Sequence, residues 1–202
     1  MIKKTFQENF WKDKFGDKYT LRNSRYTKRV NIIGNDFKKN NLKINSAFEI
    51  GCNIGLNLLA LKKLYPNLDI FGLEINSKAY NFAKNKFTCF NESIYTFKTN
   101  KKFDVVISAG VLIHQNPKML KYFYRQMYNL SKKYIYINEY FNPTPVEIPY
   151  RGYKGKLFKR DFAKELWNFF PRLKLLDYGF HWSADPKKKN NCDNSNWFLF
   201  KK

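Results

Sequence analysis

The sequence predicts an α/β fold with a mainly parallel sheet, and three observations indicate it. Short apolar runs alternate with stretches of helical periodicity along most of the chain. A glycine-bearing turn joins a strand that ends near Ile50 to a helix over residues 56–64. Residues 103–110 form a near-continuous apolar run, which is typical of a strand buried on both faces.

The other elements follow from apolar spacing and from residues that break helices. Helices are predicted where apolar side chains recur every three or four residues, and these segments are residues 56–64, 77–87, 117–130 and 162–169. Ser77 is expected to cap the second of them. Further strands are predicted at residues 69–75, 88–90, 134–140, 173–182 and 196–202. A proline-stiffened polar loop is expected over residues 141–153 and a polar hairpin loop over 186–194.

Length and composition favour one globular domain. The 202 residues are predicted to form a helical lid over 1–40 and a core over 45–202, and an apolar fraction of 44% excludes a disordered chain. No apolar run is long enough to span a membrane, and the first residues lack the apolar core of a signal peptide, so we expect a cytoplasmic protein. The three cysteines are widely spaced and predict neither disulfides nor a metal site.

The formal charge of +22 allows two interpretations. A basic surface is the usual electrostatic signature of a nucleic-acid-binding protein, or of one with an anionic substrate. The lysines, however, occur mostly as scattered doublets, and only Lys187–Lys189 forms a run. The joint abundance of Lys, Asn, Ile, Phe and Tyr is also typical of compositional drift in an A/T-rich genome, so the charge alone does not define a partner.

The turn after the first strand indicates a ligand site. Its pattern is Glu49-x-Gly51-x-Asn53-x-Gly55, in which the glycines permit positive φ and Asn53 tolerates it. Glu74 follows at the end of the next predicted strand, where a carboxylate accepts the ribose hydroxyls of an adenosine-containing cofactor. A pyrophosphate would be repelled by an acid before the first glycine, whereas a cationic ligand would be attracted. The alternative is a plain strand-to-helix turn with glycines for packing.

This turn resembles the first motif of class I S-adenosylmethionine-dependent methyltransferases, which reads acid-x-Gly-x-Gly-x-Gly. Asn53 replaces the middle glycine. The chain further resembles the methylase family associated with pseudaminic acid biosynthesis, in the stretches 10–23, 110–114, 140–152, 156–162 and 177–180. The resemblance implies a Rossmann-like class I methyltransferase fold, with a seven-stranded, mostly parallel sheet, helices on both faces and an antiparallel C-terminal strand.

The aromatic segment before the first strand is predicted to cover the cofactor. Aromatic rings attract a sulfonium through cation–π contact, and Arg22 suits the carboxylate of the cofactor's methionine portion. Trp11, Phe15 and Tyr19 are also spaced four apart, so one apolar helix face packed on the core explains them equally well. Gly16 is expected to break this segment.

The resemblance also implies the residues of the site. S-adenosylmethionine is expected to contact Trp11, Tyr19, Arg22, Glu49, Gly51, Cys52, Asn53, Gly55, Asn57, Glu74, Ile75, Ser93, Ile94, Ala109 and Gly110. The acceptor, a small and anionic molecule, is expected against Glu139, Asn142, Glu147, Tyr150 and Arg151. The catalytic candidates are His114 and Tyr140, because a base matters for a hydroxyl acceptor and the unperturbed pKa of histidine lies near working pH. Alternatively, His114 only shapes the pocket.

The expected activity is methylation of a sugar, nonulosonic acid or sugar nucleotide in surface glycan biosynthesis, without a metal. Two alternatives remain at this point. An RNA or DNA methyltransferase would fit the charge, although the stretch Asn142–Pro145 follows the fifth strand rather than the fourth, where adenine methyltransferases carry their Asn-Pro-Pro-aromatic motif. A non-catalytic protein that binds S-adenosylmethionine would fit the glycine turn.

Overall fold

A computed structural model describes residues 4–24, 32–186 and 193–202. Within these residues, a seven-stranded sheet has the strand order β3-β2-β1-β4-β5-β9-β8. Its first five strands in chain order pair in parallel, and β9 pairs antiparallel with both β5 and β8. The strands are β1 (Ser46–Ile50), β2 (Asp69–Leu73), β3 (Thr88–Phe90), β4 (Phe103–Ala109), β5 (Ser131–Glu139), β8 (Lys174–His181) and β9 (Ser195–Lys201). The predicted fold class is confirmed.

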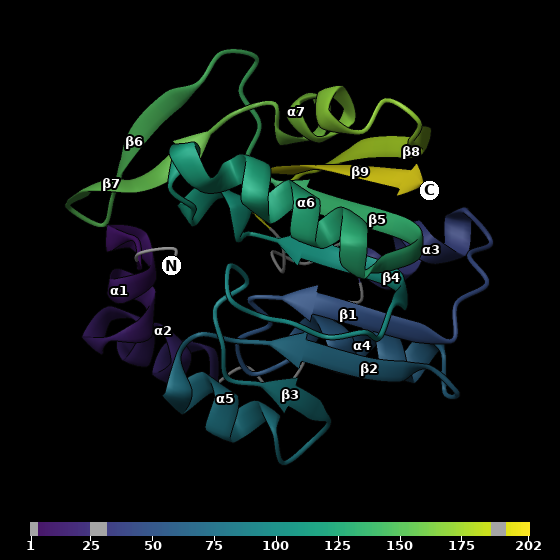
Figure 1. Ribbon diagram of the computed structural model, residues 1–202, viewed down its shortest axis with the longest axis horizontal. Helices are drawn as coiled ribbons and strands as arrows, with labels where there is room; N and C mark the ends of the chain where they lie inside the picture. The colour runs from purple at the N-terminus through teal and green to yellow at the C-terminus, as the bar shows by residue number, and fades with distance from the viewer. Residues whose placement is uncertain (1–3, 25–31, 187–192) are drawn as a thin grey trace.

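Helices cover both faces of the sheet (Figure 1). On one face, α3 (Ile32–Lys39) and α4 (Leu56–Leu64) enclose one buried cluster, which contains Phe37, Leu58 and Leu61. On the other face, α6 (Leu120–Leu130) and α7 (Phe162–Phe169) enclose a second cluster around Phe123 and Leu166. Short 3-10 helices η1 (Leu112–His114) and η2 (Pro117–Met119) precede α6. Among the described helices, none combines the length and apolarity needed to cross a membrane.

The loop before α5 (Ser77–Ala83) holds the first correction. We predicted Ser77 as the cap, but Asn76 is the N-cap, and its Oδ1 accepts a hydrogen bond from Ala79 N at 2.9 Å. Both residue types can cap a helix, so spacing alone left the position uncertain by one residue. The consequence matters for the site, because Asn76 follows Glu74 by only two residues.

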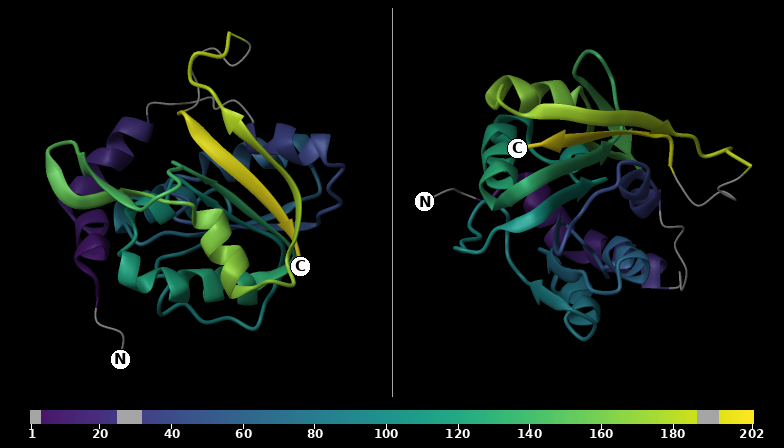
Figure 2. Two further views of the ribbon diagram at one scale, coloured as in Figure 1. Left: turned by 90° about the horizontal axis from the view of Figure 1, so that it is seen from above. Right: turned by 90° about the vertical axis from the view of Figure 1, so that its right-hand side faces the viewer.

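The N-terminal helices α1 (Phe6–Lys12) and α2 (Lys14–Ser24) lie beyond the carboxyl ends of the parallel strands (Figures 1 and 2). The prediction that Gly16 breaks this segment is wrong. The break falls at Asp13, and Gly16 lies inside α2, where a Cβ would come within 1.8 Å of Trp11 O. The glycine therefore allows α1 and α2 to approach each other closely.

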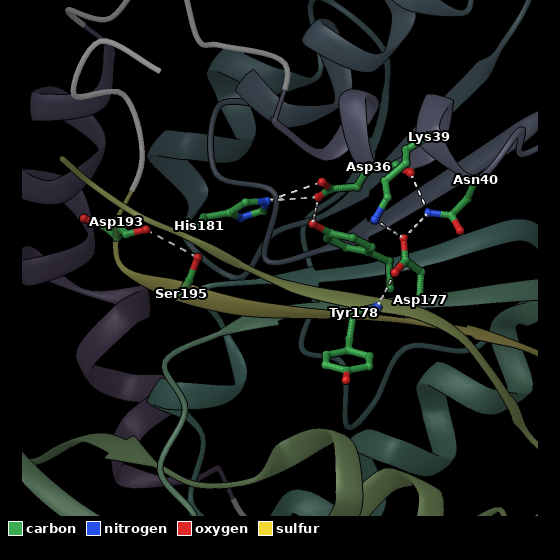
Figure 3. Close-up of polar contacts among 9 residues, drawn as sticks. Asp36, Lys39, Asn40, Asp177, Tyr178, His181, Asp193 and Ser195 are labelled. Carbon is green, nitrogen blue, oxygen red and sulfur yellow. Dashed lines mark hydrogen bonds and ion pairs between the residues drawn. The ribbon is translucent and has the colours of Figure 1, made fainter. Parts of the chain in front are cut away.

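The third N-terminal helix, α3, packs on the sheet rather than over its edge. A polar cluster ties it to the edge strand β8 (Figure 3). Asp36 Oδ2 accepts a hydrogen bond from Tyr136 OH at 2.6 Å and lies 3.1 Å from His181 Nε2, and Lys39 Nζ lies 2.9 Å from Asp177 Oδ2. Of the described part of the segment 1–40 that we predicted as a lid, α1 and α2 lie at the edge where a lid would be placed, and α3 reaches that edge with Ile32 and Ile33.

We predicted a loop over residues 141–153, and this prediction is wrong in part. They contain β6 (Val146–Tyr150), which pairs antiparallel with β7 (Tyr153–Lys159) and forms a separate two-stranded hairpin. The turn consists of Arg151 at φ 50° and Gly152 at φ 85°, and such a pair of positive φ angles is typical of tight hairpin turns. The sequence analysis missed this hairpin because proline is tolerated in a strand only at a sheet edge, so Pro149 counted against a strand here. The run Lys187–Lys189, Cys192 and most of the predicted loop 186–194 lie outside the described residues.

Candidate active site

A cavity of about 380 Å³ lies at the carboxyl ends of the parallel strands. The strand ends Ile50, Leu73, Ala109 and Glu139 line its floor, and α1, α2, η1 and the β6–β7 hairpin contribute its walls. The volume falls within the range of small-molecule sites, and its position is where open α/β sheets bind ligands.

The turn after β1 has the backbone conformation that its sequence predicted. Gly51, Asn53 and Gly55 adopt φ of 67°, 50° and 82°. A Cβ on Gly55 would lie 2.2 Å from Cε1 of Phe87, so this position needs glycine for space as well as for conformation. Cys52 N donates to Leu73 O at 3.1 Å, which fixes the turn against the end of β2.

Glu74 is buried at the end of β2 and is held by the backbone on both sides. Its Oε2 accepts from Asn53 N at 2.8 Å and its Oε1 from Asn76 N at 2.7 Å. Burial raises the pKa of Glu74, while these backbone N–H groups act in the opposite direction. Each carboxylate oxygen retains a lone pair, so the side chain can still accept a hydroxyl from a bound ligand.

Asn76 connects this cofactor loop to the N-terminal helices. Its Nδ2 lies 2.8 Å from Asp17 Oδ1 and 3.1 Å from Lys12 O. At the same time its backbone N–H donates to Glu74. The junction between α1 and α2 is therefore attached to the same loop that presents Glu74, and nothing in our sequence analysis had singled out Asn76.

The charges that line the cavity oppose the net charge of the chain. Among the lining residues that the structure describes, six carboxylates accompany one guanidinium, that of Arg151; the carboxylates are Glu8, Glu49, Glu74, Glu92, Glu139 and Asp193. The chain as a whole carries +22. Carboxylates stabilise a nearby cation and destabilise a nearby phosphate. The interior of the site thus favours a positively charged ligand.

His114, the last residue of η1, is buried and held in one orientation. Its Nδ1 lies 2.6 Å from the backbone oxygen of Lys156, and its ring lies 4.6 Å from that of Trp11 and 4.8 Å from that of Tyr150. A carbonyl oxygen can only accept, so Nδ1 carries the proton and Nε2 keeps its lone pair. Burial lowers the pKa of His114 to about 4, which leaves the ring neutral at physiological pH.

Glu139, which we predicted on the acceptor side, has its oxygens engaged within the chain. Oε1 accepts from Ser108 Oγ at 2.8 Å and from the backbone N–H groups of Val111 and Leu112 at 3.0 Å each, and Oε2 accepts from Ile113 N at 3.4 Å. Burial raises the pKa of Glu139 to about 7. The carboxylate therefore orders the segment between β4 and His114.

The acceptor-side tyrosines are half-buried in the cavity wall. Burial and the neighbouring Asp193 raise the pKa of Tyr140, and burial raises that of Tyr150, so both phenols are protonated at neutral pH. Arg151 lies beside Tyr150, with its guanidinium carbon 5.9 Å from the ring centroid. Arg151 occupies the hairpin turn and brings the guanidinium to the rim of the site.

Most of the predicted site residues line this one cavity. They are Trp11, Tyr19, Glu49, Gly51, Cys52, Asn53, Asn57, Glu74, Ile75, Ser93, Ile94, Ala109, Gly110, His114, Glu139, Tyr140, Tyr150 and Arg151.

Four predicted residues do not line the cavity. Gly55 shapes the turn, and Arg22 packs 5.5 Å from the ring centroid of Tyr19. Asn142 donates to Thr144 O at 2.6 Å, and Glu147 accepts from Gly155 N at 2.5 Å, so both stabilise their own loop and hairpin. Pattern and resemblance could not distinguish such local contacts from ligand contacts.

Glu8 and Gln7 are among the lining residues that we had not singled out, and only Glu8 left a signal in the sequence. Thr5 and Glu8 form a capping box at the start of α1, a spacing that could have been recognised. Ser93 Oγ donates to Glu8 Oε1 at 2.5 Å and so joins α1 to the loop after β3. Gln7 has no comparable sequence signal, and its Nε2 donates to Gly155 O at 3.0 Å.

Comparison with known proteins agrees with this architecture. Residues 47–133, from β1 to the start of β5, match a family model described as a methyltransferase domain. No curated protein sequence matches the chain.

Solved structures show the same fold at low sequence identity. The magnesium protoporphyrin IX methyltransferase from Synechocystis PCC 6803 is 13% identical, with a TM-score of 0.66 and full coverage of both chains. The 1,6-didemethyltoxoflavin-N1-methyltransferase from Burkholderia thailandensis is 10% identical, with a TM-score of 0.72 and coverage of 100% of this chain and 92% of the other. The N-methyltransferase NodS from Bradyrhizobium japonicum WM9 is 12% identical, with a TM-score of 0.61 and coverage of 91% and 96%.

The match to the methyltransferase-domain model covers residues 47–133. The fold, with its cavity at the carboxyl ends of the parallel strands, is that of class I S-adenosylmethionine-dependent methyltransferases. The names of the first two similar proteins point to different acceptors, so the shared fold leaves the acceptor of this chain open.

Proposed function

We propose that the enzyme methylates a hydroxyl group of a small polar acceptor, with His114 as the general base. The acceptor class is a sugar, nonulosonic acid or sugar nucleotide of surface glycan biosynthesis, in line with the resemblance to the pseudaminic acid-associated methylases. The observation that carries the proposal is the contact of 2.6 Å between His114 Nδ1 and Lys156 O, which leaves Nε2 as a proton acceptor in the cavity wall.

The cofactor-side residues fit S-adenosylmethionine. Glu74 is proposed to accept the ribose hydroxyls, the Gly51 backbone to face the methionine portion, and Ser93 with Ile94 to contact the adenine. The carboxylates along the cavity suit a cation, and the left-handed turn lets backbone approach the ligand. When bound, the cofactor supplies an electrophilic methyl group on a positively charged sulfur.

The acceptor-side residues then divide three tasks. His114 Nε2 is proposed to take the proton of the acceptor hydroxyl. Burial, which lowers the pKa of His114 to about 4, keeps the ring neutral with a free lone pair, but it also makes the ring a weaker base than free histidine. Tyr140 holds and orients the attacking group with a protonated phenol. Arg151 binds an acceptor carboxylate or phosphate. Displacement at a sulfonium needs mainly positioning and exclusion of water, which the helices and hairpin around the cavity provide.

Methylation of RNA or DNA is the second candidate, because the charge of +22 favours a polyanion. The cavity argues against it, since Arg151 is the one lysine or arginine among its described lining residues, whereas a run of phosphates needs several basic contacts. A binding titration with mixed RNA and DNA at physiological salt separates the two. Tight binding that persists at that salt would favour the nucleic-acid candidate over the sugar proposal.

The direct test is methyl transfer from isotopically labelled S-adenosylmethionine to a cell metabolite extract, followed by mass spectrometry. We expect a polyhydroxylated metabolite to gain one methyl group. His114→Asn keeps an amide donor for the Lys156 carbonyl but no base, and should lower kcat by about 10²–10⁴-fold while cofactor affinity is unchanged. Transfer to an amine or thiol, or full activity of His114→Asn, would contradict the proposal.

A further inference from the structure

Lys156 is a buried cation whose side chain reaches into the N-terminal helix. The residue is 1% exposed. Its Nζ lies 3.1 Å from the backbone oxygen of Phe6, 3.0 Å from the centroid of the Phe6 ring and 4.4 Å from that of Phe10. Burial lowers the pKa of this ammonium to about 8. Within the described residues, no carboxylate forms an ion pair with Lys156.

A buried ammonium without a carboxylate depends on its other contacts. The cost of removing such a group from water is large, and hydrogen bonds and aromatic faces are the remaining sources of compensation. All the compensating contacts of Lys156 come from α1, through Phe6 and Phe10. The ammonium is therefore stabilised only while α1 is seated against β7.

The backbone of the same residue holds the proposed base. Lys156 O is the atom that fixes His114 Nδ1 at 2.6 Å. The preceding residue, Gly155, also contacts α1, because its backbone oxygen accepts a hydrogen bond from Gln7 Nε2 at 3.0 Å. Gly155 adopts φ 69°, a conformation that favours glycine. The Trp11 ring, also from α1, lies 4.6 Å from the His114 ring. Two adjacent residues of β7 thus connect α1 to His114.

We infer that Lys156 is a positioning residue, which couples the seating of α1 to the orientation of His114. When α1 is seated, the ammonium is held and the carbonyl keeps the His114 proton on Nδ1. When α1 moves away, water must reach the ammonium, and the β7 segment that carries the carbonyl is released. The significance of this coupling for catalysis rests on the proposed role of His114, but the coupling itself can be measured without an acceptor.

The test is the titration of His114 by imidazole NMR, which is simple to assign because the chain contains only two histidines, His114 and His181. In Lys156→Met, a side chain of similar length without charge, we expect the fixed Nδ1–H tautomer to be lost. The His114 pKa should rise by about one unit or more toward that of free histidine. Lys154→Met, an exposed lysine of the same strand, is the matched control and should titrate like the wild type.

A second variant keeps the test decisive if Lys156→Met does not fold. Phe6 is 66% exposed, so Phe6→Leu removes the ring over the ammonium without opening the core. We expect a change in the same direction and of smaller size. Unchanged titration of His114 in the folded Lys156→Met protein, or in Phe6→Leu if the first variant unfolds, would overturn the inference. Failure of the proposed function would be seen separately. The wild type would then transfer no methyl group, although its His114 titrates as expected.

Discussion

The two ends of the cavity are built in different ways. At the cofactor end, the turn 49–55 and Glu74 come from consecutive strands, and left-handed backbone at Gly51, Asn53 and Gly55 shapes the surface. At the acceptor end, His114 depends on Lys156, and Lys156 depends on Phe6, which is 150 residues away. The first end is encoded locally. The second exists only once distant segments have assembled, so its geometry is the more sensitive to how those segments pack.

The largest expected effect is the loss of stability when alanine replaces a glycine in the turn at the cofactor end. Gly55→Ala adds a Cβ that would lie 2.2 Å from Phe87, on a residue at φ 82°. Left-handed strain and overpacking together should lower the free energy of unfolding by about 2–5 kcal/mol. Urea denaturation measures this loss.

Gly152→Ala is the matched control at the hairpin turn. At Gly152, φ is 85°, so alanine would be as strained there as at Gly55, but nothing lies within 4 Å of the added Cβ. We expect a loss of only about 1 kcal/mol there. Equal losses at both glycines would mean that the turn after β1 is no more tightly built than the hairpin.

The next effect is the pH dependence of stability that His114 confers. Its pKa is lowered to about 4 in the folded chain, whereas an unfolded histidine titrates near 6.5. Between these values the unfolded chain binds a proton that the folded chain does not, so stability falls as pH falls through this window. Between pH 7 and pH 4.5, wild type should lose about 2 kcal/mol more than His114→Asn.

Denaturation curves at both pH values, for both proteins, check this prediction. The comparison cancels the carboxylates, including Glu139, which titrate in the two proteins alike. A wild type that loses no more stability than His114→Asn would show that the folded chain binds this proton as readily as the unfolded chain. Burial would then not lower the pKa of His114.

The contrast between local and distant contacts also explains which parts of the site could be predicted from the sequence. The positions of the sheet strands and the turn Glu49–Gly55 could be predicted, because apolar period and glycine spacing are local signals. The hairpin β6–β7 could not, because Pro149 and a turn formed by Arg151 and Gly152 do not match the usual hairpin signals.

Side-chain roles are harder to predict than positions. Glu139 was expected to face the acceptor because it ends a strand at the ligand edge, yet its oxygens accept from Ser108 and from the backbone of residues 111–113. Lys156 was not singled out, since one lysine among many carries no signal of burial. Only the packing of α1 against β7 distinguishes it from the exposed Lys154.

A third prediction tests the cofactor end by affinity. Glu74→Gln keeps the shape of the side chain but exchanges one acceptor oxygen for a donor, so one charged hydrogen bond to a ribose hydroxyl is lost. We expect the dissociation constant for S-adenosylmethionine to rise about tenfold, which corresponds to about 1–2 kcal/mol.

Calorimetric titration gives this constant directly. Asp69→Asn, at the exposed far end of the same strand, is the control and should bind like the wild type. A melting curve is needed as well, because Glu74 also accepts from Asn53 N and Asn76 N. Unchanged affinity of a folded Glu74→Gln protein would remove Glu74 from the proposed ribose contact.

The smallest effect concerns the two arginines, and it tests where the cofactor end stops and the acceptor end begins. Arg151 lines the cavity from the hairpin turn, whereas Arg22 lies behind Tyr19, and its Nη2 is buried without a hydrogen-bond partner among the described residues. Arg151→Gly suits the positive φ of the turn, so it removes the guanidinium without backbone strain. It should raise the acceptor KM by about 3–10-fold, the effect of about 1 kcal/mol at a solvated ionic contact, and leave cofactor affinity unchanged. Arg22→Ala should do the reverse, because Arg22 packs against the ring of Tyr19, which lines the cavity and is predicted to contact the cofactor. Equal loss of cofactor affinity in both variants would place Arg151 on the cofactor side, and the turn of the β6–β7 hairpin would then belong to the cofactor end of the cavity.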